Sequence, residues 1–367
     1  MNRYFLLLFI LLTCISSFAL PRFAARTGSF CVDCHVNPTG GELRDQRGWN
    51  ISRKYLPLIP GKEDFEMTNK LGENILFGFD IRGQYLGYLG ENSKKTDFQK
   101  MQGSFYTAVD ITEDINVVGR YDYIWNIFEG FVTAHILPNE SYIKGGSFVP
   151  NYGLRLDDHT AYTRGGDMGR ITNDRLGLIF VPTYVESGAE LGLYISDFAF
   201  LTMSVGNNLS PSIFIKDPSY TASLQIRPTL GEHMGLFFGG SFMNFKQRVG
   251  LNIQNSTMYG GFIGFGIMGF SLLGEYDIAQ DYIVKDTSSS ALMIEASYQI
   301  IRGLEAVVRY DRFDPLSKIN DNELSRIVLG FDIFPYNFIE LKTQYRIQNE
   351  TPSIKNDAFV VQFHLFY

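Results

Sequence analysis

Apolar and polar residues alternate along most of this chain, in segments of about ten residues that recur from position 75 to position 367. In the first segment the apolar set is Ile75, Phe77, Phe79 and Ile81, and the polar set is Gly78, Asp80, Arg82 and Gln84. Successive side chains of a strand point to opposite faces, so one face suits lipid and the other suits water. Beyond residue 20 no apolar run is long enough for a membrane helix. The pattern therefore predicts an all-β fold, a transmembrane antiparallel β-barrel.

Further segments repeat this alternation, and the end of the chain shows it most clearly. They are residues 105–111, 176–185, 236–245, 259–268, 292–300, 304–310, 327–334 and 338–345. In the last segment the apolar set is Phe359, Val361, Phe363, Leu365 and Tyr367, with Gln362 and His364 on the opposite face. A final strand that ends on an aromatic residue resembles the assembly signal of outer-membrane barrels.

Turns and composition support the same architecture. Short turns at 301–303 and 335–337 alternate with longer polar stretches at 246–256 and 285–290. Aromatic residues make up 15% of the chain and it holds 36 glycines, a bias that suits a large membrane β-structure. Because both termini of bacterial barrels lie on one side, we expect about sixteen strands, within residues 71–367. The alternative is a soluble protein of two β-sandwiches, whose strands should carry fewer large aromatics toward solvent.

The N-terminus has the composition of a secretory signal peptide, over residues 1–19. Asn2 and Arg3 form a weakly basic start, and the apolar stretch after them is too short for a spanning helix. Small residues up to Ala19 favour cleavage after that position. Cys14 is then discarded with the signal; the alternative is a lipidated cysteine, for which the preceding residues make a poor motif. Export and a barrel together predict the outer membrane of a Gram-negative-type bacterium.

A C-x-x-C-H motif follows the signal, formed by Cys31, Cys34 and His35. Two thiols at this spacing can form thioethers with both vinyl groups of a haem, while the adjacent imidazole lies beneath the iron. We therefore expect one covalent c-type haem, with His35 as the proximal ligand of its iron. The alternatives are a thioredoxin-like redox pair, for which no βαβ context exists, and a zinc half-site, which lacks a second cysteine pair.

Residues 20–70 differ from the barrel region and include a stretch, 42–56, in which we expect a short helix. A segment of this size is too small for a core of its own without a covalent staple, which a haem would supply. The lumen of a barrel of about sixteen strands is wide enough for water or a plug. We therefore expect this monohaem cytochrome c segment to plug the lumen from the periplasmic side.

The sixth ligand of the iron has several candidates. They are His135, His159, His233, His364 and Met67. His159 is the candidate we name, because residues 151–174 are rich in Arg and Asp and could fold into the lumen as a constriction. The simpler interpretation of that segment is a solvated extracellular loop, and both interpretations stay open. His364 is expected to face the lumen as a polar residue of the last strand.

The stretch PRFAARTGSFCVDCHVNPTGG, which begins at Pro21, resembles the haem-site region of the fused cytochrome–porins. These are single-chain outer-membrane proteins with an N-terminal monohaem segment and a barrel of about sixteen strands. A Phe-Ala-Arg-x-Thr-Gly element precedes the haem motif in that family, and residues 23–28 come close to it, with Arg26 shifted by one place. The resemblance implies Cys31, Cys34 and His35 as haem-binding residues, and oxidation of ferrous iron outside the cell as the activity.

The leading hypothesis is electron transfer from an extracellular donor, with Fe(II) as the candidate, to a periplasmic cytochrome or another carrier. The protein would then be an Fe(II) oxidase or a simple electron-transfer protein, and no catalytic residue is assigned. One alternative is a transport porin whose haem segment is a plug or redox sensor; another is a soluble periplasmic cytochrome with a β-rich partner domain. A net charge of −7 with scattered basic residues gives no nucleic-acid footprint, so the expected surroundings are outer-membrane lipid.

Overall fold

The computed structural model describes residues 21–41, 43–61, 67–89, 94–156, 158–166, 176–179, 184–208, 217–231, 234–249, 252–350 and 356–367. The predicted signal peptide at 1–19, with Cys14, lies outside these residues, and so does the alternative ligand His233. Part of the predicted constriction, residues 157 and 167–174, also lies outside them.

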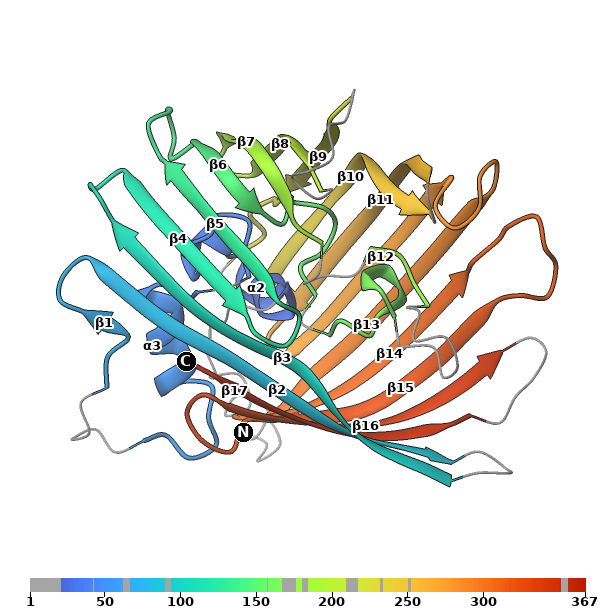
Figure 1. Cartoon of the computed structure of the whole chain (residues 1–367). Helices are drawn as coiled ribbons and strands as arrows, with labels where there is room; N and C mark the ends of the chain where they lie inside the picture. The colour runs from blue at the N-terminus through green and yellow to red at the C-terminus, as the bar shows by residue number, and fades with distance from the viewer. Residues whose placement is uncertain are drawn as a thin grey trace.

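Sixteen antiparallel strands form a closed barrel in the described part of the chain (Figure 1). They are β2 (Ile75–Leu89), β3 (Lys94–Asp110), β4 (Ile115–Asp122), β5 (Ile127–Ala134), β6 (Tyr142–Phe148), β7 (Glu186–Ser196), β8 (Ala199–Asn207), β9 (Ser219–Ile226), β10 (Met234–Val249), β11 (Asn252–Ile267), β12 (Phe270–Gln280), β13 (Ser288–Ile301), β14 (Leu304–Asp314), β15 (Leu324–Ile333), β16 (Ile339–Glu350) and β17 (Ala358–Phe366). Each pairs with the next along the chain, and β17 pairs with β2 to close the ring. The barrel is confirmed, and the two-sandwich alternative is wrong.

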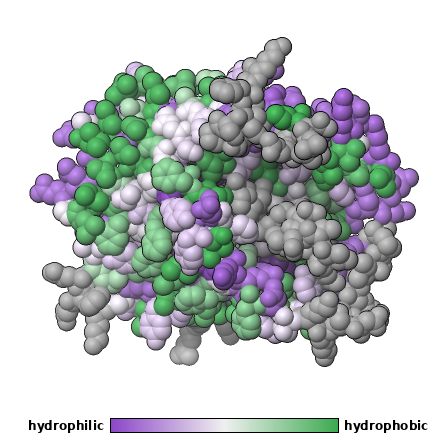
Figure 2. Space-filling model, in the orientation of Figure 1, coloured by the Kyte–Doolittle hydropathy of each residue, from purple (hydrophilic) through white to green (hydrophobic). Residues whose placement is uncertain are grey.

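Alternation along the strands separates a lipid face from a lumen face. On β17, Phe363 is 44% exposed, whereas the next residue, His364, is 3% exposed and lies inside the barrel. The buried residues of the strands include many charged and hydroxyl side chains, and the exposed ones include many aromatic and aliphatic side chains. Hydrophobic residues cover much of the visible exterior in Figure 2. This is the arrangement that lipid outside and a polar lumen inside require.

Two sequence predictions about strands are wrong in detail. The described residues of the segment 176–185 form no strand before β7; Leu178 and Ile179 are buried in an apolar cluster with Tyr152 and Tyr162. Their apolar character serves packing in the lumen, so it mimics the alternation of a strand without being one. The polar stretch 246–256 is also not a long loop, because β10 and β11 continue through most of it in register.

The two ends of the barrel differ in the length of their connections. Turns at 268–269, 302–303 and 334–338 join neighbouring strands at the end where the chain terminates, and the turns predicted at 301–303 and 335–337 are among them. Longer connections, such as 281–287 and 315–323, lie at the opposite end. Short turns are periplasmic and long loops extracellular in bacterial barrels, so the C-terminus marks the periplasmic end.

The N-terminal plug, residues 21–41 and 43–61, enters the barrel from this periplasmic end. Its helix α2 (Pro21–Thr27) lies inside the barrel against β10, β11 and β12, and helix α3 (Gln46–Lys54) lies near the C-terminus (Figure 1). The α3 helix, predicted within 42–56, begins where the Asp45 carboxylate accepts a hydrogen bond of 2.7 Å from the Gly48 amide. After α3 the chain meets a turn of the barrel, where the Leu58 amide donates to the Phe334 carbonyl at 2.8 Å.

Among the described residues, no helix combines the length and the apolar character needed to cross a membrane.

Candidate functional site

A tight turn at the start of the plug positions the C-x-x-C-H residues. The helix η1 (Cys31–Asp33) begins after Phe30, whose amide donates to the Asp33 carboxylate at 2.8 Å. The amides of Cys34 and His35 then both donate to the Cys31 carbonyl, at 3.2 and 3.0 Å. The five residues of the motif are therefore held as one compact turn by local hydrogen bonds.

A cavity of about 170 Å³, partly open to solvent, lies beside this turn within the lumen. Cys31 and His35 of the plug line it. From the barrel wall and from the segment after β6, it is also lined by Gln102, Arg155, His159, Phe200, Arg227 and Phe237. The plug, the barrel wall and the segment after β6 therefore all contribute to the lining of one space beside the motif.

Cys34 has a different environment from Cys31. Its side chain is not part of the cavity lining described above; it is buried in an apolar cluster with Phe23, Trp49 and Phe338. Both cysteines are free thiols. Burial raises the pKa of Cys31, although Arg227 and Arg155 act against it, and burial raises the pKa of Cys34 to about 11. Both thiols are thus protonated at neutral pH, which disfavours the redox-pair interpretation, because such pairs need a stabilised thiolate.

The constriction loop, residues 149–156 and 158–166, folds into the lumen. Its Tyr152 hydroxyl donates to Asp277 on β12 at 2.9 Å, and Arg164 pairs with Glu275 on the same strand at 2.5 Å. Further along the loop, Asp158 pairs with Arg309 on β14 at 2.8 Å. The interpretation of this segment as a solvated extracellular loop is therefore wrong for the described residues, and the constriction is confirmed for them.

His159 reaches the cavity from this loop. It lines the same cavity as Cys31 and His35, and its Nε2 lies 3.4 Å from the Gln102 side-chain oxygen on β3. Two imidazoles from segments far apart in the sequence therefore face one space. Burial of a loop with charged residues inside the barrel is what brings His159 here.

The other described candidates for an axial ligand lie elsewhere. His135 follows β5 and its Nδ1 lies 3.2 Å from the Glu140 carbonyl, at the surface. Met67 packs against the apolar cluster that holds Cys34 and Trp49. His364 faces the lumen as predicted, where its two ring nitrogens contact Asp80 at 2.9 Å and Glu340 at 2.7 Å. Among the described residues, no three His, Cys, Asp or Glu side chains form a group that could hold a metal ion.

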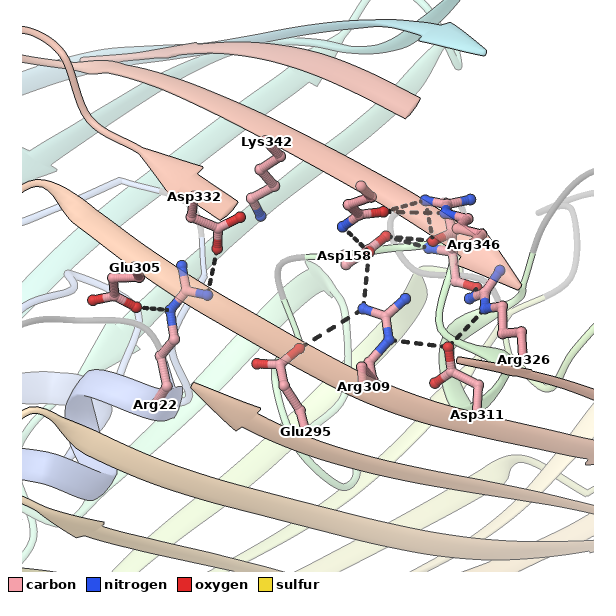
Figure 3. A network of polar contacts seen from close by, with 12 residues as sticks. Arg22, Asp158, Glu295, Glu305, Arg309, Asp311, Arg326, Asp332, Lys342 and Arg346 are labelled. Carbon is pink, nitrogen blue, oxygen red and sulfur yellow. Dashed lines mark hydrogen bonds and ion pairs between the residues drawn. The ribbon is translucent and has the colours of Figure 1, made fainter. Parts of the chain in front are cut away.

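A buried ionic network holds the plug and the loop against the barrel wall (Figure 3). Arg22 of α2 lies between Glu305, at 3.3 Å, and Asp332, at 2.5 Å. Arg26, one turn later, pairs with Glu305 at 2.7 Å. These side chains come from α2, β14 and β15, which no sequence motif connects, so the network was not predicted. The only signal was the lumen-facing position of the acidic residues on their strands.

Contacts between the plug and the loop complete the site. The Arg155 guanidinium donates to the Thr39 hydroxyl at 3.3 Å and to the Val149 carbonyl at 2.9 Å. Lys144 on β6 donates to the Asn37 side-chain oxygen at 3.0 Å and pairs with Glu190 at 2.7 Å. The residues that follow His35 are therefore tied to both the constriction loop and the wall. Chemically, the site offers a thiol, two imidazoles and several guanidinium groups around one cavity.

Comparison with known proteins places the fold. No family model matches the chain, and no curated protein matches it. Among solved structures, OprB of Pseudomonas putida is similar with a TM-score of 0.61 at 8% identity, covering 80% of this chain and 94% of that one. The outer membrane channel DcaP of Acinetobacter baumannii is similar with a TM-score of 0.57 at 10% identity, over 80% of this chain and 97% of that one.

An anion-selective porin from Comamonas acidovorans is also similar, with a TM-score of 0.55 at 10% identity over 80% of this chain and 98% of that one. At such identities the likeness concerns the fold. The chain has the closed 16-strand antiparallel barrel of outer-membrane porins. Its location is the outer membrane of a Gram-negative bacterium.

Proposed function

We propose that this barrel is an electron-transfer protein of the outer membrane, in which the cavity beside Cys31 and His35 takes one covalently attached c-type haem. The observation that carries the proposal is the presence of Cys31, His35 and His159 in the lining of one lumenal cavity. A C-x-x-C-H motif buried in a barrel lumen has no simple role in strand pairing or lipid contact. A cavity next to it, lined by a thiol, two imidazoles and guanidinium groups, supports a cofactor there.

The donor set supports a c-type haem in chemical terms. Cys31 already lines the cavity, whereas attachment through both thiols requires the Cys34 side chain to turn out of its apolar cluster toward the cavity. Gly40 supports a close fit, since a Cβ at this position would lie 3.0 Å from the Cys31 sulfur. Gly40 also has a φ of +83°, which other residues rarely adopt. A side chain at position 40 would therefore crowd the Cys31 sulfur and strain the backbone.

His35 and His159 are the residues that would hold the haem iron. The first comes from the plug and the second from the constriction loop, so the iron would link the two segments that fill the lumen. A haem with two imidazole ligands supplies one-electron redox chemistry, and its potential depends on ligands, burial and nearby charge. The role of the chain is to hold both imidazoles, to exclude most water and to place charged groups around the cavity.

The position of the cavity suits transfer between the two sides of the membrane. The plug reaches the periplasmic turns, where the exposed side chains of Tyr55, Leu58 and Ile59 are available to a periplasmic cytochrome or another carrier. The constriction loop belongs to the long connection between β6 and β7, which departs from the extracellular end. We propose an extracellular donor there, with Fe(II) as the candidate that the resemblance to cytochrome–porins implies.

A transport porin with a haem-bearing or redox-sensing plug is the second candidate. The similarity to solved channels and porins favours it. The plug and the constriction loop are tied to the wall by buried ion pairs, which supports a lumen with little room for solute flow. Conductance separates the two functions: an electron conduit should be nearly closed in planar bilayers, and a porin should be open.

The deciding experiment is spectroscopy and mass measurement on protein purified from outer membranes. We expect the mass of one haem on the wild-type chain, and none on a Cys31→Ala, Cys34→Ala variant that still assembles as a barrel. His159→Ala should keep the haem but convert a low-spin spectrum to high-spin. Wild-type protein without haem mass would reject the electron-transfer function and leave the porin candidate. An unchanged spectrum in His159→Ala would reject His159 as a ligand.

A further inference from the structure

Arg227 is a buried cation that has no carboxylate partner among the described residues. It follows β9, is 5% exposed and lines the cavity beside Cys31. Its guanidinium donates to the Gln225 side-chain oxygen at 3.3 Å and to the Ser29 carbonyl, and it lies over the rings of Phe30 and Phe237, at 4.7 and 4.9 Å. These contacts satisfy hydrogen bonds without neutralising the charge.

Three other buried arginines of the lumen each have a carboxylate partner. Arg22 pairs with Asp332 at 2.5 Å, Arg164 with Glu275 at 2.5 Å and Arg326 with Asp311 at 2.7 Å. A buried charge without a partner costs several kcal/mol, so proteins normally provide one. Burial lowers the pKa of Arg227, although Cys31 and Asp33 act in the opposite direction. Among the described residues, Arg227 therefore differs from these three arginines in lacking a carboxylate partner.

Arg155 adds a second guanidinium to the same cavity. In the described part of the chain it bonds to the Thr39 hydroxyl and the Val149 carbonyl, both neutral groups, and to no carboxylate. Arg155 and Arg227 approach from different elements, the constriction loop and the end of β9, and both act electrostatically on Cys31. The planar guanidinium fork matches a carboxylate or phosphate in geometry as well as in charge. Two such groups face one cavity, which is the arrangement that binding of an anion requires.

We propose that Arg155 and Arg227 bind a carboxylate-bearing ligand in this cavity and that, in the protein with haem, they bind the haem propionates. The second clause rests on the proposed function, and the first does not. When the propionates are bound in the cavity, the two arginines keep them ionised and add positive charge beside the iron, which favours the reduced state of the iron. They are positioning residues that would tune the redox potential.

The test is a spectroelectrochemical titration of purified Arg227→Gln at several pH values. We expect a full haem content, a lower midpoint potential than the wild type, and a potential that varies more steeply with pH near neutrality, because an unpaired propionate takes up a proton more readily. Arg227→Lys keeps the charge and should recover part of the shift. Arg47→Gln is the matched control, since Arg47 lies close to the motif but its side chain is 57% exposed. Its potential should match the wild type, because solvent screens the charge.

A second arm separates the haem propionate from a free anion. In the Cys31→Ala, Cys34→Ala barrel, acetate at increasing concentration should raise the melting temperature if the arginines bind free carboxylates, and Arg227→Gln should remove that effect. A shift in potential supports the haem propionate as the ligand, whereas an acetate effect alone supports the anion site with a solute as its ligand. If wild-type protein proves to hold no haem, the proposed function fails and the acetate arm still tests the arginines. The proposal is overturned if two results occur together. Arg227→Gln must have the same midpoint potential as Arg47→Gln, and in the barrel without the two cysteines it must bind acetate as well as the protein that keeps Arg227.

Discussion

The two sides of the lumen are built from different side chains. On β14, β15 and β16 the buried lumen-facing residues are mostly charged: Glu305, Arg309, Asp311, Arg326, Asp332, Glu340, Lys342 and Arg346. On β8, β9 and β10 they are mostly hydroxyl residues: Thr202, Ser204, Ser219, Thr221, Ser223 and Ser241. We call these the charged wall and the hydroxyl wall. The charged wall binds α2 and the constriction loop, whereas Ser223 of the hydroxyl wall lines the cavity.

Side-chain chemistry explains this division of roles. Buried charges must be paired, so the charged wall selects segments that bring complementary charges, such as Arg22 and Asp158. Serine side chains are short and satisfy each other, as the Ser241 hydroxyl does by donating to the Ser223 hydroxyl at 2.9 Å. They leave space and bring no charge that another segment must neutralise. The difference shows that anchoring and ligand space are divided between opposite sides of one barrel.

Removing the plug's contacts with the charged wall should have the largest effect. In Arg22→Ala, Arg26→Ala, the buried carboxylates of Glu305 and Asp332 lose their partners in α2. Breaking a buried pair costs about 3–5 kcal/mol, which corresponds to a shift of more than about a hundredfold toward an undocked plug. Planar-bilayer recordings should show a clear gain of conductance. Arg47→Ala removes an exposed plug arginine and should stay closed; equal conductance in both variants would contradict the anchoring role.

Weakening the contact between the constriction loop and the charged wall should have an intermediate effect. Burial by itself would raise the pKa of Asp158, but Arg309 and Arg346 hold it well below its usual range. A depressed carboxyl pKa gives stability that is complete above the unfolded value, about 3.9, and that is lost only as the pH falls through the lower folded value. Wild-type loop docking should therefore not change between pH 8 and pH 5.

The matching variant is Asp158→Asn, which removes the charge that meets Arg309 at 2.8 Å. We expect a loss of about 1.5–3 kcal/mol in loop docking, measured as faster protease cleavage within the loop. Glu323→Gln is the control, because it breaks an ion pair with Arg312 in which both side chains are more than two-fifths exposed, at 43% and 45%. Faster cleavage of the wild type at pH 5 than at pH 8 would contradict the depressed pKa of Asp158.

A change on the hydroxyl wall should have the smallest effect. Ser223→Ala removes the hydrogen bond from Ser241, which still accepts from the Gly153 amide at 2.9 Å. A neutral hydrogen bond contributes about 0.5–1.5 kcal/mol, so thermal unfolding should shift only slightly. The haem spectrum that the proposed function predicts should be unchanged, since Ser223 carries no charge. A destabilisation as large as that of the arginine variants would mean that the two walls do not differ in the way described.

Periodicity made most of the barrel predictable. The two-residue alternation of Phe363 and His364 separates lipid from lumen because a strand's geometry depends on adjacent residues alone. The same rule failed at Leu178 and Ile179, whose apolar side chains serve the lumen core. It also failed at 246–256, where polar residues continue two strands past the expected loop. The apolar or polar character of a segment reflects its surroundings rather than its secondary structure. A segment buried in the lumen can therefore resemble a strand, and strands with polar residues can resemble a loop.

The C-x-x-C-H motif belongs to the part that the sequence by itself determined. The spacing of Cys31, Cys34 and His35 acts within one turn, so local hydrogen bonds are enough to bring them together. The sequence left open whether residues 151–174 lie in the lumen, because that depends on distant partners such as Arg309. It named His159 and could not place it.

Only the tertiary structure decided what surrounds the motif. His35, His159 and Arg227 line one cavity although they belong to the plug, the constriction loop and the end of β9. Closure of the ring between β17 and β2 is what brings such segments within reach of each other. Arg227 carries no local signal, since an arginine after a strand is ordinary until the barrel buries it with no carboxylate partner among the described residues. Strand faces and the C-x-x-C-H motif are local in sequence, whereas the cavity and its charges arise from contacts across the closed barrel.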